Sequence, residues 1–194
     1  MPPSLDLLPL FLYNSSMKEK RNAWIYLLRA LFLTLTACAL MFIFFQSAQD
    51  GEASAAQSVQ VTVQVQEIVG AIAPDSPIAT ATGEDFDLLH AFVRGTAHFL
   101  EYAFLGACAF ASYLSFTRRK RWAWLVPGLV AGVAVMDEIL QSFRAGRAAE
   151  FLDVFIDVCG GIIGCGCTLA AFFIIVLCVN AVRRKQDEKE SRYE

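Results

Sequence analysis

The sequence has few charged residues and only two histidines. Charged residues make up 18% of the 194 positions, against about 25% in a typical soluble domain. Hydrophobic residues make up 56%, and the mean hydropathy is +0.48. A disordered chain needs low hydrophobicity and high net charge, so that class is excluded. An ordinary soluble domain is disfavoured, and a net charge of −3 predicts no nucleic-acid partner.

The sequence also lacks the cysteine and histidine patterns of disulfide scaffolds and metal sites. All six cysteines lie in apolar runs: Cys38, Cys108, Cys159, Cys165, Cys167 and Cys178. None forms C-x-x-C, and no H-E-x-x-H motif occurs. We therefore expect no disulfide framework, no metal and no cofactor, and we interpret the cysteines as small residues that fill helix interfaces.

Four apolar runs hold most of the hydrophobic residues. They predict membrane spans at about 24–45, 94–117, 122–141 and 153–181. A helix of about 20 residues crosses a hydrocarbon core of about 30 Å. Buried helices of a soluble bundle would each need a polar face, and these runs show none over most of their length. The sequence predicts an all-α integral membrane four-helix bundle over residues 23–182.

Basic residues predict how the chain is oriented. Thirteen of the sixteen lie on one side of the predicted spans. They are Lys18, Lys20, Arg21 and Arg29, then Arg118, Arg119, Lys120 and Arg121, then Arg183, Arg184, Lys185, Lys189 and Arg192. Arg94, Arg144 and Arg147 are on the other side. Because Lys and Arg accumulate on the cytoplasmic side, we expect both termini, residues 1–22 and 183–194, to be cytoplasmic.

The first residues suggest a second possible start. Residues 1–16 carry one charge, whereas Met17 is followed at once by Lys-Glu-Lys-Arg and the first span. We therefore hypothesise that Met17 is the initiator. The apolar region that follows is longer than a signal peptide's 7 to 15 residues, and no A-x-A site follows Phe45. We expect a retained anchor.

Residues 46–94 form the long segment between the first two spans, with seven acidic residues and no lysine. Residues 59–66 alternate apolar and polar, as a strand does. However, apolar side chains also follow helical spacing at Val61, Val65, Ile68, Val69 and Ile72. Because a lone strand would have no partner, we expect a helix on the outer membrane surface.

Local signals mark a break, a helix start and close helix contacts. Pro74-Asp75-Ser76-Pro77 should break the chain. Asp85 is expected to cap a helix that starts near Phe86 and continues into the second span. Two small-x3-small pairs, Gly128 with Gly132 and Gly160 with Gly164, predict close helix contacts.

Ionisable and amide side chains recur near the outer end of every predicted span, at helical spacing. They are Gln46, Ser47 and Gln49; His90, Arg94, His98 and Glu101; Asp137, Glu138, Gln141 and Arg144; and Glu150, Asp153 and Asp157. Arg147 lies in the short connection between the last two spans. Lipid cannot solvate such groups, so they must face one another or water.

Two interpretations stay open: a salt-bridge network that only fixes packing, and a polar pocket open to the outside. We favour the pocket because acids outnumber nearby bases. Its predicted members are Gln49, Arg94, His98, Glu101, Asp137, Glu138, Gln141, Arg147, Asp153 and Asp157. In a catalytic pocket His98 would be the general base, oriented by Glu101, Asp137 or Asp157. No serine or cysteine is obviously paired with it.

The motifs resemble those of the VanZ family. They are Ser47-x-Gln49, Arg94-x3-His98-Phe99-x-Glu101-Tyr102, Asp137-Glu138-x2-Gln141-x-Phe143, Arg147, and Asp153-x3-Asp157-x2-Gly160-Gly161-x2-Gly164. The resemblance covers about Phe42 to Ala171. Three positions depart from the family pattern. Gly95 is found where the family usually has a lysine, Leu140 where a histidine is frequent, and Ala145 where a proline is common.

The resemblance implies a small multi-span protein of the bacterial plasma membrane. The family's namesake is an accessory protein in glycopeptide resistance, associated with teicoplanin, and many members lie outside resistance clusters. We predict an accessory factor in the cell envelope or in such resistance. Its pocket would bind an anionic or amide-bearing group of a glycopeptide or lipid head, with Arg144 and Arg147 suited to a carboxylate or phosphate.

Other functions stay open. One is a membrane-embedded hydrolase or transferase that acts on a lipid-linked envelope substrate. Another is a proton-coupled transporter, since His and carboxylate chains form proton relays. A purely structural or assembly role is the last. Membrane lipid is the expected partner in every case, and the sequence leaves the oligomeric state open.

Overall fold

The computed structural model describes residues 15–117, 120–147 and 150–190, which form five α-helices and one 3₁₀ turn. The elements are α1 (Ser15–Ser47), α2 (Gly51–Ile72), α3 (Glu84–Phe116), η2 (Lys120–Trp122), α4 (Leu125–Ser142) and α5 (Phe151–Glu190). Four helices are long and apolar enough to cross a membrane: Ala23–Ser47, Glu84–Phe116, Leu125–Ser142 and Phe151–Gln186. The prediction of an all-helical protein with four candidate membrane spans is confirmed. Residues 1–14, which include most of the predicted N-terminal segment, and Arg118, Arg119 and Arg192 lie outside the described residues.

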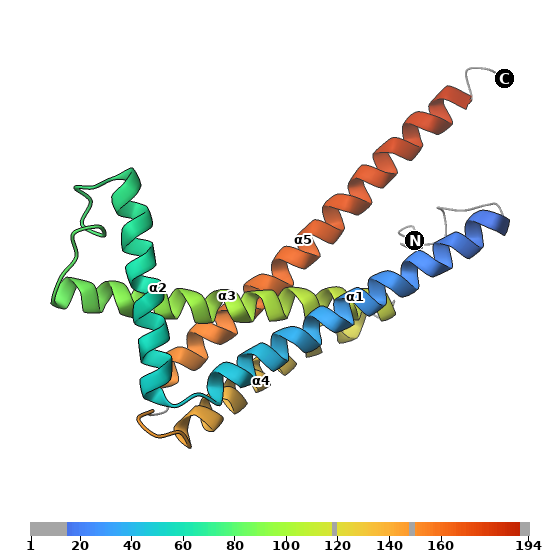
Figure 1. Ribbon diagram of the computed structural model, residues 1–194. Coiled ribbons are helices and arrows are strands. Elements are labelled where there is room, and N and C mark those ends of the chain that lie inside the picture. Colours follow the sequence, from blue (N-terminus) through green and yellow to red (C-terminus); the bar gives the residue numbers. More distant parts are fainter. Residues whose placement is uncertain (1–14, 118–119, 148–149, 191–194) are drawn as a thin grey trace.

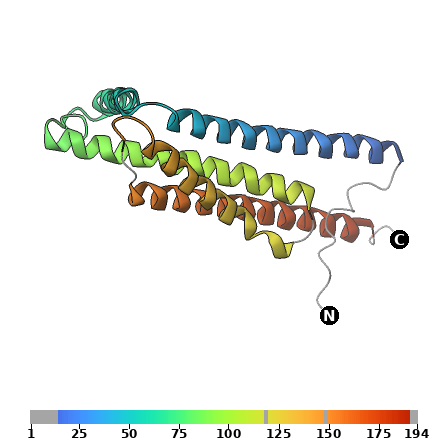
Figure 2. The same cartoon turned by 90° about the horizontal axis from the view of Figure 1, so that it is seen from below.

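The four spanning helices lie side by side, with α3 in the centre (Figures 1 and 2). α3 contacts α1, α2, α4 and α5, and most extensively α5. α1 begins and α5 ends at one end of the bundle. At the opposite end, called here the cavity end, α1 and α4 finish, α5 begins and α2 lies crosswise (Figures 1 and 2).

The structure confirms that the segment after the first span is helical. α2 turns half-buried Ser54, half-buried Ser58 and fully buried Thr62 towards the bundle. Gln60 and Gln64, on the opposite face, are exposed. The backbone N–H of Gly51 donates to Ala145 O at 3.0 Å, which ties the start of α2 to the α4–α5 connection. In that connection Gly146 has a φ of +73°, a conformation that favours glycine.

The structure changes two predictions about helix starts, the cap of α3 and the first residue of α4. The helix cap assigned to Asp85 was wrong: Gly83, at a φ of +59°, is the cap, and Asp85 lies in the first turn of α3. α3 starts at Glu84, within two residues of the start predicted near Phe86, and continues into the second span as predicted. α4 starts at Leu125 because Lys120–Trp122 form a 3₁₀ turn first. The predicted break at Pro74–Pro77 is confirmed, since α2 ends at Ile72.

Glycines bring α3 and α5 into backbone contact. A Cβ on Gly160 would collide with the carbonyl oxygen of Phe99, and one on Gly164 with that of Ala103. A Cβ on Gly106 of α3 would collide in turn with Gly161 O. The close helix contact predicted for Gly160 and Gly164 is thus confirmed.

The prediction for Gly128 and Gly132 was wrong. Both glycines are exposed, and a Cβ on either would have no atom within 4 Å among the described residues. The pair lies on the side of α4 that no other described helix covers. The small-x3-small spacing is the same in both pairs, so only the rotation of the helix distinguishes them.

A small apolar core fills the bundle on the far side of the cavity end. Its buried members are Ala39, Ile43, Tyr102, Leu105, Val130 and Ala134. Many large apolar side chains are exposed, for example Leu129 at 70% and Phe173 at 58%, as expected of helices that face lipid. All six cysteines are free, as predicted.

Candidate functional site

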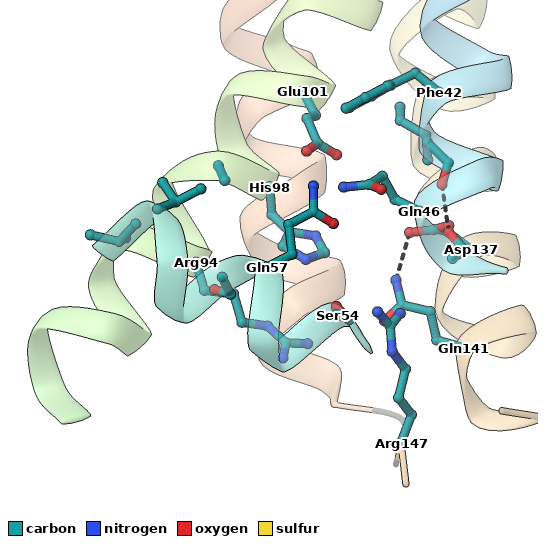
Figure 3. A pocket seen from close by; sticks show the side chains of 16 residues that line it. Phe42, Gln46, Ser54, Gln57, Arg94, His98, Glu101, Asp137, Gln141 and Arg147 are labelled. Carbon is teal, nitrogen blue, oxygen red and sulfur yellow. Dashed lines mark hydrogen bonds between the residues drawn. The ribbon is translucent and has the colours of Figure 1, made fainter. Parts of the chain in front are cut away.

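A cavity of about 200 Å³ lies at the cavity end, beneath α2 (Figure 3). α1, α2, α3, α4 and the α4–α5 connection all contribute to its wall. Its lining residues are Phe42, Ile43, Gln46, Ser47, Ser54, Gln57, Ser58, Val61, Val93, Arg94, Ala97, His98, Glu101, Asp137, Gln141 and Arg147. The structure thus brings polar side chains from five segments to one cavity.

Six of the ten predicted pocket residues line this cavity: Arg94, His98, Glu101, Asp137, Gln141 and Arg147. Four do not: Gln49, Glu138, Asp153 and Asp157. Gln46 lines the cavity in place of Gln49, and its Oε1 accepts a hydrogen bond from the Gln49 amide at 2.9 Å. Glu138 accepts the backbone N–H of Glu150. Arg144, expected beside Arg147, is exposed and outside the lining.

His98 is held between the cavity and α5. Its Nδ1 lies 3.4 Å from Asp157 Oδ1, and Asp157 is 1% exposed. The imidazole also lines the cavity, so Asp157 acts from behind as an orienting carboxylate. This is the geometry that a general base requires.

Arg94 is also paired with α5. Its Nη2 lies 3.5 Å from Asp153 Oδ2, and its side chain is 37% exposed. Because Asp153 and Asp157 are four residues apart, they lie on one face of α5, where they meet Arg94 and His98 of α3. The two pairs fix the rotation of α3 against α5 at the cavity.

Asp137 is a buried carboxylate with neutral donors. Ser47 Oγ donates to Asp137 Oδ1, and Gln141 Nε2 donates to Oδ2 at 2.9 Å. Asp137 is 2% exposed. These donors satisfy both oxygens and join α1 to α4, so Asp137 is part of the wall.

Two ionisable side chains in the lining have no partner among the described residues. Arg147 makes no side-chain hydrogen bond or ion pair there, and its buried Nε is unsatisfied. Burial, followed by the nearby charge of Arg94, lowers the pKa of Arg147. An arginine still stays cationic near neutral pH. Glu101 likewise makes no hydrogen bond or ion pair within that part of the chain, although it lines the cavity.

Sequence reasoning missed the contribution of α2. Ser54, Gln57, Ser58 and Val61 cover the cavity between the spans. Their signal was present: Ser54, Ser58 and Thr62 follow one another at intervals of four, which puts three hydroxyls on one helix face. That face meets the bundle because the opposite face carries glutamines.

The lining favours binding over covalent chemistry. Ser47 is engaged by Asp137 and by Ile43 O, and among the described residues no serine hydroxyl is hydrogen-bonded to His98. No group of three His, Cys, Asp or Glu side chains that could hold a metal ion occurs in the described ranges. The cavity therefore offers charge and hydrogen bonds.

The order and spacing of these residues agree with a known family. The family model described as VanZ/LLP1 matches residues 32–176. The chain belongs to the VanZ/LLP1 family. No curated protein and no solved structure matches it. None of the three departures from the VanZ pattern, Gly95, Leu140 and Ala145, lines the cavity.

Proposed function

We propose that this VanZ-family protein is an accessory factor of the bacterial cell envelope whose cavity binds an anionic terminal group of a lipid head or peptide. The observation that carries the proposal is Arg147, a cation in the cavity wall without an ion-pair partner among the described residues. Leaving a charge unpaired in a partly buried site is costly, and a bound carboxylate or phosphate removes that cost.

The cavity would face outward in this proposal. α1 begins and α5 ends at the opposite end of the bundle. The turn η2 contains Arg121, and the C-terminal part of α5 contains Arg183 and Arg184. Because basic residues accumulate on the cytoplasmic side, both termini would be inside and α2 would lie on the outer surface. Reporter fusions after residue 194 and within residues 73–83 should give opposite signals.

The size of the cavity limits its ligand. A volume of about 200 Å³ is below the roughly 300 to 1,000 Å³ of sites that enclose drug-sized molecules. A head group or a peptide terminus fits such a space, whereas a whole glycopeptide does not. If the protein contributes to teicoplanin-type resistance, it would do so by binding an envelope component that carries such an anionic terminal group, and not by binding the antibiotic itself.

A hydrolase or transferase is the second candidate function, and the His98–Asp157 pair favours it. The imidazole lines the cavity while the buried carboxylate holds Nδ1 from behind. Such a pair could activate a water for attack on a lipid-linked substrate. Purified protein should then hydrolyse such a substrate, and His98→Ala should abolish turnover without abolishing binding.

Proton-coupled transport receives less support. Below the cavity the bundle is closed by Tyr102 and Leu105, which are 0% and 1% exposed, together with the rest of the apolar core. A transported ion or substrate would have to cross this layer. Uptake into vesicles would support the transport function.

Arg147→Gln is the decisive variant for the proposed binding function. Expression in a glycopeptide-susceptible bacterium should alter envelope sensitivity for the wild type and not for Arg147→Gln. Arg144→Gln is the matched control, because it removes an exposed arginine from the same connection. Equal phenotypes for both variants, at equal membrane expression, would refute a role for the cavity cation.

A further inference from the structure

The two unpartnered ionisable groups of the cavity carry opposite charges and come from different levels of the bundle. Glu101 lies seven residues beyond Arg94 on α3, about 10 Å further from the cavity end. The close-up shows Arg147 with Arg94 at one end of the cavity and Glu101 at the other (Figure 3). The cavity thus has a cationic mouth and an acidic inner end.

The other ionisable side chains that line the cavity each have a partner. Arg94 pairs with Asp153, His98 faces Asp157, and Asp137 accepts hydrogen bonds from Ser47 and Gln141. Within the described residues, Arg147 and Glu101 remain. A purely anionic ligand would satisfy Arg147 but bring a second negative charge towards Glu101. Like charges in such a space repel, so a simple anion fits poorly.

Two apolar side chains in the cavity lining are exposed on the outside of the bundle. Phe42 of α1 is 51% exposed, and Val61 of α2 is 42% exposed. Exposed apolar residues on a spanning helix and on a helix across the bundle end are covered by lipid in a membrane. A ligand with an apolar tail could therefore leave its head in the cavity and its tail beside Phe42.

We propose that the ligand is a zwitterion, with its phosphate or carboxylate on Arg147 and its ammonium on Glu101. This inference rests on the proposed binding function and adds the second charge. An ethanolamine phosphate group has this chemistry, either as the head of a phospholipid or as a free molecule. The small volume of the cavity and the exposed apolar side chains in its lining both suit a head group.

Native mass spectrometry of the full-length protein in detergent tests this proposal. The protein is offered equimolar phosphatidylethanolamine and phosphatidylglycerol with the same acyl chains. The wild type should retain the ethanolamine lipid at least about tenfold better, because a hydrogen-bonded ion pair at a partly buried site contributes that much. Phosphatidylcholine has a cation without N–H donors and should bind less well than the ethanolamine lipid.

Substitutions separate the two contacts. The Glu101→Gln variant should lose the preference for the ethanolamine lipid but still bind phosphatidylglycerol. The Glu101→Asp variant should keep part of the preference. Arg147→Gln should weaken both lipids by a similar factor. Glu67→Gln and Arg144→Gln are matched controls, because both residues are exposed and outside the lining. They should bind as the wild type does.

The outcomes distinguish this inference from the function on which it rests. The zwitterion proposal would be overturned if Glu101→Gln kept the preference for the ethanolamine lipid. It would also be overturned if the wild type bound both lipids equally well through Arg147. In both cases the anion site would remain. Binding that is independent of Arg147 would overturn both proposals. Displacement by soluble O-phosphoethanolamine would show that a free molecule suffices, whereas retained lipid at excess competitor would assign the site to lipid.

Discussion

His98 on α3 and Asp157 on α5 face each other with 3.4 Å between Nδ1 and Oδ1, and both atoms lack a hydrogen-bond partner elsewhere among the described residues. The contact lies next to Gly160, where a Cβ would collide with Phe99 O. The close approach of the helices and the buried pair therefore depend on each other. The same pair that positions His98 at the cavity also joins the two helices.

We expect strong coupling between His98 and Asp157 in stability. Asp157→Ala should lower the free energy of unfolding by about 3–5 kcal/mol, because one partner of a buried pair is left alone. His98→Ala combined with Asp157→Ala should cost clearly less than the sum of the single changes. A double-mutant cycle of unfolding in detergent measures this. Additivity within about 0.5 kcal/mol would show that the pair does not interact.

The two glycine pairs give a matched stability test. Gly160→Ala and Gly164→Ala should each lower the melting temperature, because the added Cβ meets a backbone carbonyl of α3 that cannot move aside cheaply. Gly132→Ala is the control on α4. It adds a Cβ in open space and should be neutral or stabilise by up to about 1 kcal/mol, as Ala favours helix over Gly.

Thermal unfolding followed by circular dichroism in one detergent compares these variants. The expected order is Gly164→Ala and Gly160→Ala below the wild type, with Gly132→Ala at or above it. If the three variants had the same melting temperature as the wild type, α3 and α5 could move apart without a cost in stability.

Hydropathy and helical spacing predicted the spans and most of the cavity wall, because both depend on local order along one helix. Arg94, His98 and Glu101 share a face of α3 whatever surrounds it. Rotation between helices is a tertiary property, so the spacing alone could not tell that Gln46 rather than Gln49 lines the cavity. The same reason explains why Gly128 and Gly132 look like a contact pair and are exposed.

Ser47 should be more important for stability than its size suggests. Ser47→Ala removes a donor to the buried Asp137, and an under-satisfied buried carboxylate should cost about 1–3 kcal/mol. Ser142→Ala is the control, because that exposed hydroxyl donates to Ile139 O in its own helix. It should change stability by less than about 0.5 kcal/mol. Chemical unfolding of both variants measures the difference, and similar values would argue against the Ser47–Asp137 bond.

Gln66 should determine the order of the segment between α2 and α3. Its Nε2 donates to Ile78 O at 3.1 Å and to Ala81 O at 3.0 Å, so one side chain holds two turns against α2. Gln66→Leu removes both bonds, and amide exchange in residues 76–83 should become about tenfold faster, since each bond contributes about 1 kcal/mol. Gln64→Leu changes an exposed glutamine two residues away and should leave this exchange unchanged. Hydrogen–deuterium exchange with mass spectrometry resolves these peptides. The same rate in both variants would show that the turns hold the segment without Gln66.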